Sequence, residues 1–395
     1  MQQHEVIVIG GGIGGLGLAH YCRAQGRDVC VLEREPRVGG ALHSARFPSE
    51  FWLELGGHTG YNSYGRLLAL MEALGLAGRL TPRETARWML WREGRVRSIP
   101  SQLGWLELAV SLPRWLGARR AGATVAGYYG RLLGARNFQR VGRPMLSAVV
   151  SQDAADIPAE LLFKKRPRRK DVPRSFAVGG GLQSIPEAVA AQPGLTVRTG
   201  AVAERVERVG AAWRVTAGDG ETLEAPTLAL ATGPDVAAAL LAEALPALAG
   251  LLGGIGTVPL ESEGVVVRAD RVRLPRMAGL VGVEAPFWSV VTRDPVGHPD
   301  FRGFAAHFRP ETPPEERTAR LCSVLSVTPE ALEARAGAAR RLPSPRAGHA
   351  ALVRRIDGLL AGERLLLTGN WFGGLAIEDC LARSAAEAER LAVLG

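Results

Sequence analysis

The chain has 395 residues, 47% of them hydrophobic and 22% charged, a composition typical of globular proteins that excludes a disordered, collagen-like or multispanning chain. Its length exceeds that of one typical domain, so we predict a molecule of two lobes. The net charge of +9 favours anionic partners, such as acidic lipid surfaces or carboxylate-bearing substrates, but no recognition motif accompanies it and no nucleic-acid partner is predicted.

The first predicted elements are a strand, a glycine-rich turn and a helix. A β-branched apolar run at residues 5–10 predicts a buried parallel strand, and apolar residues at helical spacing predict a helix at residues 16–25. In the turn between them, Gly10 permits the tight bend, Gly12 lets the backbone approach a pyrophosphate, and Gly15 allows the helix to pack closely on the strand. Unpaired N–H groups and the helix dipole then favour phosphates at the start of the helix.

Glu33 ends a second predicted strand at residues 28–32, about 20 residues beyond the turn, where a carboxylate binds the hydroxyls of a ribose and disfavours a 2′-phosphate. NAD and FAD both bind such turns. The segment from Arg37 to Gly39 and Gly40 resembles the extended flavin fingerprint of the glutathione-reductase-like and amine-oxidase-like flavoproteins. Its glycines let the backbone lie against the diphosphate or the ring system, and Arg37 adds a cation. FAD is therefore the predicted cofactor.

A helical region is predicted after these first strands. Helical spacing of apolar residues predicts helices at residues 66–74, 103–116, 125–133 and 138–150. Before this region, a short apolar segment ends in glycines and brings His58 close to the flavin. After it, the basic run at residues 164–170 is predicted to be a solvated connection, with contact to an anionic surface as the alternative.

The remaining chain is predicted to return to the nucleotide-binding domain and to build a second, mixed lobe. The expected elements are a helix after the glycines of residues 179–181, strands at 195–209, 213–216, 228–232, 264–268 and 287–292, a helix at 329–340, a strand at 364–370 and a helix at 378–394. The predicted fold class is α/β: a Rossmann-type FAD-binding domain with an inserted helical region and a mixed α+β substrate domain. The FAD-binding domain takes residues 1–62, 171–250 and 356–395, the helical insertion 63–170 and the substrate domain 251–355.

The order of these segments resembles the FAD-dependent protoporphyrinogen and coproporphyrinogen oxidases, within the amine-oxidase-like flavoprotein superfamily, over most of the chain. The resemblance rests on Gly-Gly-Ala-Leu-His-Ser at residues 39–44, a strand-turn ending in proline at residues 91–100, and Gly-Gly-Leu-Gln-Ser-Ile-Pro at residues 180–186. It also rests on a C-terminal signature, in which Gly348 and His349 precede Gly-Asn-Trp-Phe-Gly-Gly-Leu-Ala-Ile-Glu-Asp-Cys at residues 369–380. The chain is shorter than most members of the family, and the losses fall in the insertion and the second lobe.

The resemblance extends the set of predicted FAD contacts. In this family the C-terminal turn lies over the diphosphate and ring edge of the flavin, and a valine that matches Val202 meets the adenine through its backbone. The residues predicted to contact FAD are Gly10, Gly12, Ile13, Gly14, Gly15, Glu33, Arg34, Arg37, Gly39, Gly40, Ala41, Val202, Gly369, Asn370, Gly373, Gly374, Leu375 and Ala376.

The resemblance implies an oxidoreductase that oxidises a porphyrinogen-like substrate by hydride transfer to flavin N5, with oxygen as the acceptor. One alternative is an amine, polyene or natural-product dehydrogenase or oxidase of the same superfamily; another is a flavin-retaining binding protein without turnover. His58 and His349 are the candidate catalytic residues, as proton acceptors or orienters, with a structural histidine as the alternative for each.

Membrane contact is predicted at most at the periphery. In the family, the helical region covers the substrate and sits on a membrane surface, and here Trp105, Trp115 and Arg114 lie in an amphipathic stretch that suits that role, with a core-facing helix as the alternative. The sequence lacks an uninterrupted run of about 18 apolar residues and a secretory signal, so we expect a cytoplasmic protein, with peripheral contact at the inner membrane face as an extension. The four cysteines are too sparse for a disulfide framework or metal site, and no metal is predicted. The oligomeric state stays open.

Overall fold

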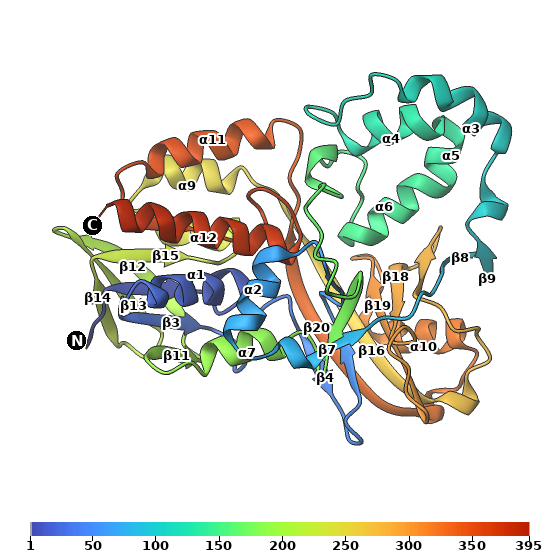
Figure 1. The fold of residues 1–395 in the computed structure, drawn as a ribbon, viewed down its shortest axis with the longest axis horizontal. Helices are drawn as coiled ribbons and strands as arrows, with labels where there is room; N and C mark the ends of the chain where they lie inside the picture. The colour runs from blue at the N-terminus through green and yellow to red at the C-terminus, as the bar shows by residue number, and fades with distance from the viewer. Residues whose placement is uncertain (1, 395) are drawn as a thin grey trace.

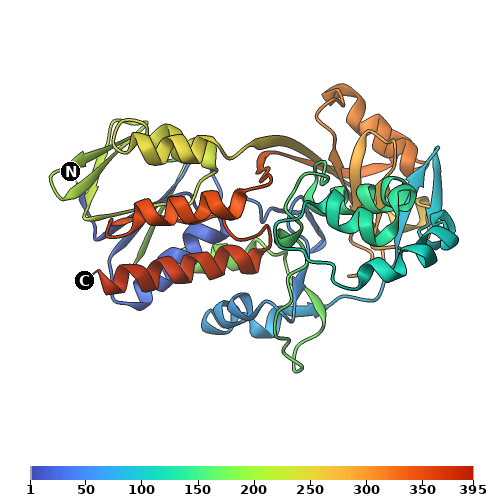
Figure 2. The ribbon, with the colours of Figure 1, turned by 90° about the horizontal axis from the view of Figure 1, so that it is seen from above.

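The computed structural model describes residues 2–394, which form two lobes (Figures 1 and 2). The first lobe is built on a five-stranded parallel sheet with the strand order β11-β3-β2-β15-β21. Its strands are β2 (Val6–Ile9), β3 (Val29–Glu33), β11 (Leu195–Thr199), β15 (Thr227–Leu230) and β21 (Leu365–Leu367). Every residue of β2, β3, β15 and β21 is buried, as expected for a parallel sheet that is covered on both faces.

Helices and a second small sheet cover the two faces of this parallel sheet (Figure 1). One face shares a core with α1 (Ile13–Ala24), α2 (Gly65–Ala73), α7 (Ser184–Ala190) and α12 (Ile377–Val393). The other face shares a core with α8 (Pro234–Leu241), α9 (Pro246–Gly253), α11 (His349–Leu360) and the sheet β1-β14-β13-β12. That sheet comprises β1 (Gln2–Gln3), β12 (Ala203–Val209), β13 (Ala212–Ala217) and β14 (Thr222–Ala225). Strand residues alternate between these cores, which fixes the layers.

The second lobe is built on a seven-stranded mixed sheet with the order β20-β16-β19-β18-β17-β8-β9. Its strands are β8 (Trp88–Arg92), β9 (Arg95–Ser98), β16 (Thr257–Arg268), β17 (Gly279–Gly282), β18 (Phe287–Thr292), β19 (Phe301–Phe308) and β20 (Leu332–Pro343). α10 (Pro314–Leu325) packs on one face, where Leu321 and Leu325 meet Phe304 and Phe308. The opposite face packs against the inserted helices.

The inserted helices form a layer beside this sheet and above its edge in Figure 1. They are α3 (Trp105–Ser111), α4 (Val125–Leu133), α5 (Ala135–Asn137), a π-helical turn (Phe138–Gly142) and α6 (Arg143–Val150). Between the lobes lie the three-stranded sheet of β6 (Gly60–Tyr61), β10 (Ser175–Val178) and β7 (Leu80–Pro82), and the hairpin of β4 (Ser44–Arg46) and β5 (Trp52–Glu54). Short 3-10 turns occupy Ala77–Arg79, Pro100–Gln102, Leu112–Trp115, Ala159–Leu161, Ala269–Arg271 and Pro329–Ala331.

The structure confirms the predicted fold class and corrects several elements within it. The helix predicted at residues 329–340 is wrong, because this segment begins the long strand β20, which pairs with β16 from Leu332 to Pro343. Its alanine-rich and arginine-rich sequence favours a helix, but pairing along a sheet edge overrides that local preference. The helix predicted at 103–116 stops at Ser111, where a 3-10 turn containing Pro113 follows.

Candidate functional site

The glycine-rich turn joins β2 to α1 at the carboxyl edge of the parallel sheet. Gly10 has a φ of +110°, and a Cβ there would lie 2.7 Å from the carbonyl oxygen of Ala231. A Cβ on Gly15 would lie 1.9 Å from the Gly10 oxygen, so helix and strand are as close as the absence of side chains allows. α1 begins at Ile13, with Gly12 at its N-cap position, and has no side-chain cap and no acidic residue in its first turn. Its first N–H groups are therefore available to an anion.

A second glycine segment lies directly against this turn. The N–H of Gly39 donates to the oxygen of Gly11 at 2.8 Å, and Gly39 and Gly12 form a parallel bridge. Arg37 is half-buried and donates from Nη2 to the oxygen of Gly40 at 3.3 Å, and burial lowers its pKa. The structure therefore brings Arg37, Gly39 and Gly40 beside the phosphate turn. Arg34, by contrast, is exposed, and its Nε lies 3.5 Å from a carboxylate oxygen of Glu35.

Glu33 lies at the carboxyl end of β3 and is buried. Its Oε2 accepts from the N–H of Gly11 at 2.7 Å, and its Oε1 accepts from the N–H of Glu35 at 2.8 Å. A carboxylate has about four acceptor positions, so both oxygens can still receive ribose hydroxyls. The segment before β12 lies alongside, since the backbone N–H of Ala201 donates to the backbone carbonyl oxygen of Glu33 at 2.9 Å. Val202 follows with 46% of its surface exposed, next to the ribose acid where the adenine is expected.

The C-terminal turn lies between β21 and α12, facing the start of α1. A Cβ on Gly14 would lie 3.7 Å from the Cα of Gly369, which has a φ of +148°. Gly374 packs against the carboxylate of Asp379, leaving no room there for a side chain. Asn370, Gly373, Leu375 and Ala376 complete this turn, with Ala376 capping α12 and Leu375 packed against the inserted helices.

The basic run at residues 164–170 holds this turn. We predicted from the sequence only that this run is a solvated connection, so this role was missed. Arg166 donates to Asp379 at 2.7 Å, and Lys164 lies 3.2 Å from the same oxygen. Lys164 also donates to the Gly373 oxygen. Both cations lie more than 200 residues from Asp379 in the chain, so no local pattern could have revealed the pairing.

The two candidate catalytic histidines occupy different surroundings. His349 is buried and its Nε2 lies 2.6 Å from the Trp371 oxygen and 3.2 Å from the Phe372 oxygen. Because carbonyls only accept, Nε2 carries the proton and holds the C-terminal turn, which favours the orienting role. Trp371 and Phe372 are buried and stacked at 3.8 Å within the core, so they form part of the packing. His58 lies between the lobes, and burial lowers its pKa to about 4.

His58 belongs to a cluster of imidazoles in which His307 lies near His58, and His307 and His43 both lie near Arg340 of β20. His307 of β19 bonds through Nδ1 to the Ser262 hydroxyl at 2.8 Å, and burial, with His58 and Arg340 nearby, lowers its pKa to about 3. Burial, with Arg37 and Arg340 nearby, lowers the pKa of His43 to about 4. All three imidazoles are neutral at pH 7. Of these three histidines, only His58 was predicted from the sequence to be part of the site.

Glu54 anchors a second buried polar network at the end of β5. Ser44 donates to its Oε2 at 2.6 Å, and the N–H of Leu182 donates to its Oε1 at 2.8 Å. Gln183 completes the network, because its side-chain oxygen accepts from the Ser44 N–H at 3.0 Å. Burial raises the pKa of Glu54 to about 7 despite these hydrogen bonds. The network ties the β4–β5 hairpin to the glycine segment of residues 179–181.

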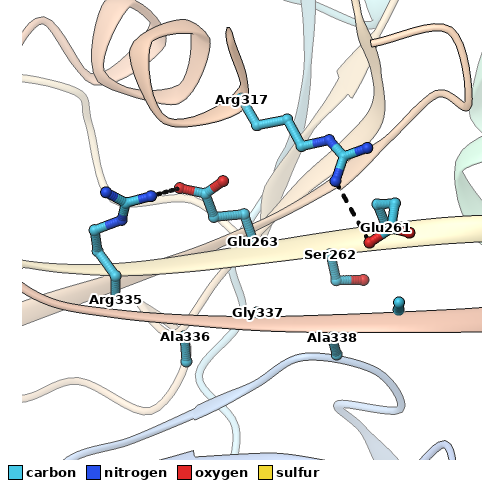
Figure 3. A pocket seen from close by; sticks show the side chains of 9 residues that line it. Glu261, Ser262, Glu263, Arg317, Arg335, Ala336, Gly337 and Ala338 are labelled. Carbon is cyan, nitrogen blue, oxygen red and sulfur yellow. Dashed lines mark hydrogen bonds and ion pairs between the residues drawn. The ribbon is translucent and has the colours of Figure 1, made fainter. Parts of the chain in front are cut away.

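Two hollows are open on the second lobe. The first, of about 450 Å³, lies between β16, β20 and α10, and its charges are already paired: Arg335 lies 3.2 Å from Glu263 and Arg317 3.4 Å from Glu261 (Figure 3). The second, of about 620 Å³, lies between the inserted helices and the sheet and is within the size range of small-molecule sites. It is lined by Arg92, Arg136, Gln139, Arg140, Arg143, Pro144, Ser147, Asp153, Gly282, Val283, Glu284, Trp288 and Arg309.

The second hollow, called here the arginine cavity, holds five arginines and two carboxylates. Arg143 already pairs with Asp153, with 3.0 Å between Nε and Oδ1. Arg309 stacks over the Trp288 ring at 3.8 Å. Arg136 and Arg140 are exposed and have no carboxylate partner within the described residues. The cavity therefore carries uncompensated positive charge.

Comparisons with known proteins all find similarity to flavin-dependent oxidases. The profile of the family described as flavin containing amine oxidoreductase matches residues 13–391. Flavin-containing amine oxidase B of Sus scrofa is 38% identical over 72 residues, 18% of this chain and 14% of that protein. The chloroplastic protoporphyrinogen oxidase of Nicotiana tabacum is 25% identical over 201 residues, 46% of this chain and 35% of that protein. Both matches thus span well under two thirds of these relatives.

Among solved structures, a candidate protoporphyrinogen oxidase from Exiguobacterium sp. 255-15 matches with a TM-score of 0.80 and 18% identity. The match covers 100% of this chain and 99% of that chain, and at this identity it shows the fold alone. The residues around the turn fit FAD, the cofactor of a flavin-containing family. The uncapped start of α1 suits the diphosphate, Glu33 the ribose, and the side-chain-free surfaces of Gly12 and Gly40 a close approach of the cofactor.

Proposed function

We propose that this chain, which belongs to the flavin containing amine oxidoreductase family and is an FAD-dependent oxidoreductase, oxidises a porphyrinogen-like substrate with oxygen as acceptor. The observation that carries the proposal is the arginine cavity, because a porphyrinogen carries several carboxylates and guanidinium groups bind carboxylates in well-defined geometry. The names of the tobacco relative and of the Exiguobacterium structure support the same substrate class.

The position of the arginine cavity suits a substrate that reaches the flavin. Arg309 directly follows β19, and His307 lies two residues before it on that strand. Phe304, Ala306 and Phe308 face the α10 core, so His307 and Arg309 share the opposite face. The arginine cavity and the imidazole cluster are thus joined along one side of one strand.

Each group has a role in this proposal. When bound, FAD supplies the oxidising power by accepting a hydride at N5, and oxygen then takes up the electrons as hydrogen peroxide. The arginines hold the substrate carboxylates, and the lobes exclude water between them. His58 is neutral at pH 7 because its pKa is lowered, so it orients substrate by a hydrogen bond and does not contribute charge.

The proposal is tested by mixing the FAD-loaded protein anaerobically with coproporphyrinogen and protoporphyrinogen while following the flavin absorption. We expect rapid bleaching, followed by porphyrin fluorescence and hydrogen peroxide when oxygen is admitted. Bleaching by amines or polyenes, with none by either porphyrinogen, would assign the chain to the other substrate classes of its superfamily. Flavin that no candidate reduces would point to a binding protein.

Variants of the arginine cavity test the recognition step. The double variant Arg136→Gln/Arg140→Gln loses two exposed ion pairs with substrate carboxylates, which together are worth about 1 kcal/mol of binding free energy. We expect this loss to raise KM about fivefold and to leave kcat nearly unchanged. Arg131→Gln is the matched control, because Arg131 is exposed on α4 and does not line the cavity. Equal KM values for all three proteins would remove the cavity from substrate binding.

We further propose that α3 and the turn after it rest on an anionic membrane surface. Exposed large apolar side chains gather here: Trp105, Leu106, Val110, Leu112, Trp115 and Leu116. Arg114 and Arg119 are exposed beside them, whereas Arg120 turns inward and donates to the Phe163 oxygen at 3.0 Å. Apolar residues flanked by exposed arginines suit an interfacial contact. None of the helices in residues 2–394 is long and apolar enough to cross a bilayer.

A further inference from the structure

Arg340 reaches from the second lobe onto the glycine segment beside the phosphate turn. Its Nη1 donates to the oxygen of Ala41 at 3.0 Å, although the two residues are 299 positions apart. Gly56 leaves the space for it, since a Cβ there would lie 2.2 Å from the same Nη1. Ala41 follows Gly39 and Gly40, which pack on Gly11 and Gly12. The guanidinium is therefore placed at the far end of the surface that begins with the diphosphate turn.

The second nitrogen of this fork has no partner. Nη2 of Arg340 is buried and makes no hydrogen bond to any of residues 2–394, and Nδ1 of the neighbouring His43 is in the same condition. Burial, with Arg37 nearby, lowers the pKa of Arg340 to about 10, so it stays charged at pH 7. Among residues 2–394, no carboxylate lies close enough to Arg340 to form an ion pair, whereas Arg335 and Arg341 of the same strand each have one.

The side chains around Arg340 leave its Nη2 without an acceptor. Glu35 and Glu54 raise its pKa through the electric field alone, and burial and the Arg37 cation outweigh them. His43 and His307 beside it are uncharged at pH 7 because their pKa values are lowered. A buried cation with an unused donor is costly unless an anionic or accepting group completes it. The cation is placed to be completed by a group outside the chain, at the Ala41 end of the segment of Gly39, Gly40 and Ala41.

We propose that Arg340 donates from Nη2 to the bound flavin and stabilises the negative charge that the flavin gains on reduction. A cation held against the ring is a protein group that tunes the cofactor, because it favours the reduced form over the oxidised form. The inference rests on FAD binding and is independent of which substrate reduces the flavin.

The reduction potential of the FAD-loaded protein tests this. Arg340→Gln removes the charge, and we expect at least a tenfold weaker preference for the reduced flavin, which for a two-electron couple is a potential lower by ~30 mV. Affinity for sulfite, whose adduct at N5 is also anionic, should fall in parallel. Arg340→Lys keeps the charge and should restore most of both. Arg340→Met, which keeps the length of the side chain without its charge, provides the measurement if the glutamine variant retains too little FAD, and a potential equal to that of Arg341→Gln would then overturn the proposal.

Arg341→Gln is the matched control. Arg341 is the next residue after Arg340 on β20, so it points to the opposite face, and it pairs with Asp235 at 3.0 Å. It should leave the potential and the sulfite affinity unchanged. An unchanged potential in Arg340→Gln would overturn the proposal. If that variant instead raised only the KM for substrate, Arg340 would be a substrate contact, which also overturns it.

Discussion

The carboxylate of Glu33 accepts a hydrogen bond from the backbone N–H of Gly11 at 2.7 Å, which ties this predicted ribose-binding acid to the glycine turn predicted to bind the diphosphate. This bond joins the two parts of the nucleotide site across 22 residues, and a second one to Glu35 holds the other oxygen. Hydrogen bonds to a charged group are worth about 1.5–3 kcal/mol. The orientation of Glu33 is therefore fixed before FAD arrives.

We predict that Glu33→Ala weakens FAD binding by a factor of about 100 or more, because about 3 kcal/mol of contacts to the ribose and the turn is lost. Titration of the deflavinated protein with FAD, followed by quenching of flavin fluorescence, measures the change. Glu35→Gln is the control, since its side chain is half-exposed and only its backbone contacts Glu33. Wild-type affinity in Glu33→Ala would mean that the ribose is bound elsewhere.

Glu54 gives the protein a pH-dependent stability. Burial raises its pKa from 4.5 to about 7, so between these values the folded protein binds a proton that the unfolded chain releases. Its contribution is complete below pH 4.5 and is lost as the pH rises through 7, with a total on the order of 3 kcal/mol. Glu54→Gln cannot ionise, and we expect it to flatten this part of the profile and to gain on wild type at pH 8.

Thermal and urea unfolding of the FAD-loaded proteins at pH 5 and pH 8 measures this difference. Glu50→Gln is the control, because Glu50 is exposed on the same hairpin. It should keep the wild-type change between the two pH values. Parallel profiles for wild type and Glu54→Gln would show that Glu54 is already ionised in the folded protein at pH 5.

Local geometry explains what could be predicted from the sequence. The glycine turn and Glu33 were predicted because their spacing sets their geometry along a few adjacent residues. Arg340 was missed because its partner Ala41 lies 299 residues away and because its own segment has a helical composition. The pairing of Arg166 with Asp379 was missed for the same reason. Long-range contacts depend on how the lobes pack, which local patterns do not encode.

His349 is expected to stabilise the C-terminal turn. His349→Ala leaves the buried oxygens of Trp371 and Phe372 without their shared donor, and we predict a loss of about 1–3 kcal/mol in the free energy of unfolding. Denaturant unfolding of the FAD-loaded protein measures it. Arg346→Gln, an exposed change three residues earlier, should lose little. Wild-type stability in His349→Ala would free this imidazole for the proton-accepting role.

The apolar patch formed by α3 and the turn after it is expected to bind anionic vesicles. Leu106 and Leu116 are 81% and 82% exposed, and each contributes about 1.5 kcal/mol when its side chain enters the acyl boundary. Leu106→Ser/Leu116→Ser should therefore bind phosphatidylglycerol vesicles about 100-fold more weakly in a sedimentation assay, with its FAD content unchanged.

The matched control for that patch is Val393→Ser, because Val393 is 87% exposed at the end of α12 in the other lobe. This variant should bind vesicles as wild type does. Raised salt should weaken the wild-type binding as well, because Arg114 and Arg119 attract the lipid headgroups only over about a Debye length. Equal sedimentation of wild type and the double serine variant would exclude this patch as the membrane contact, and the exposed leucines would then need another partner.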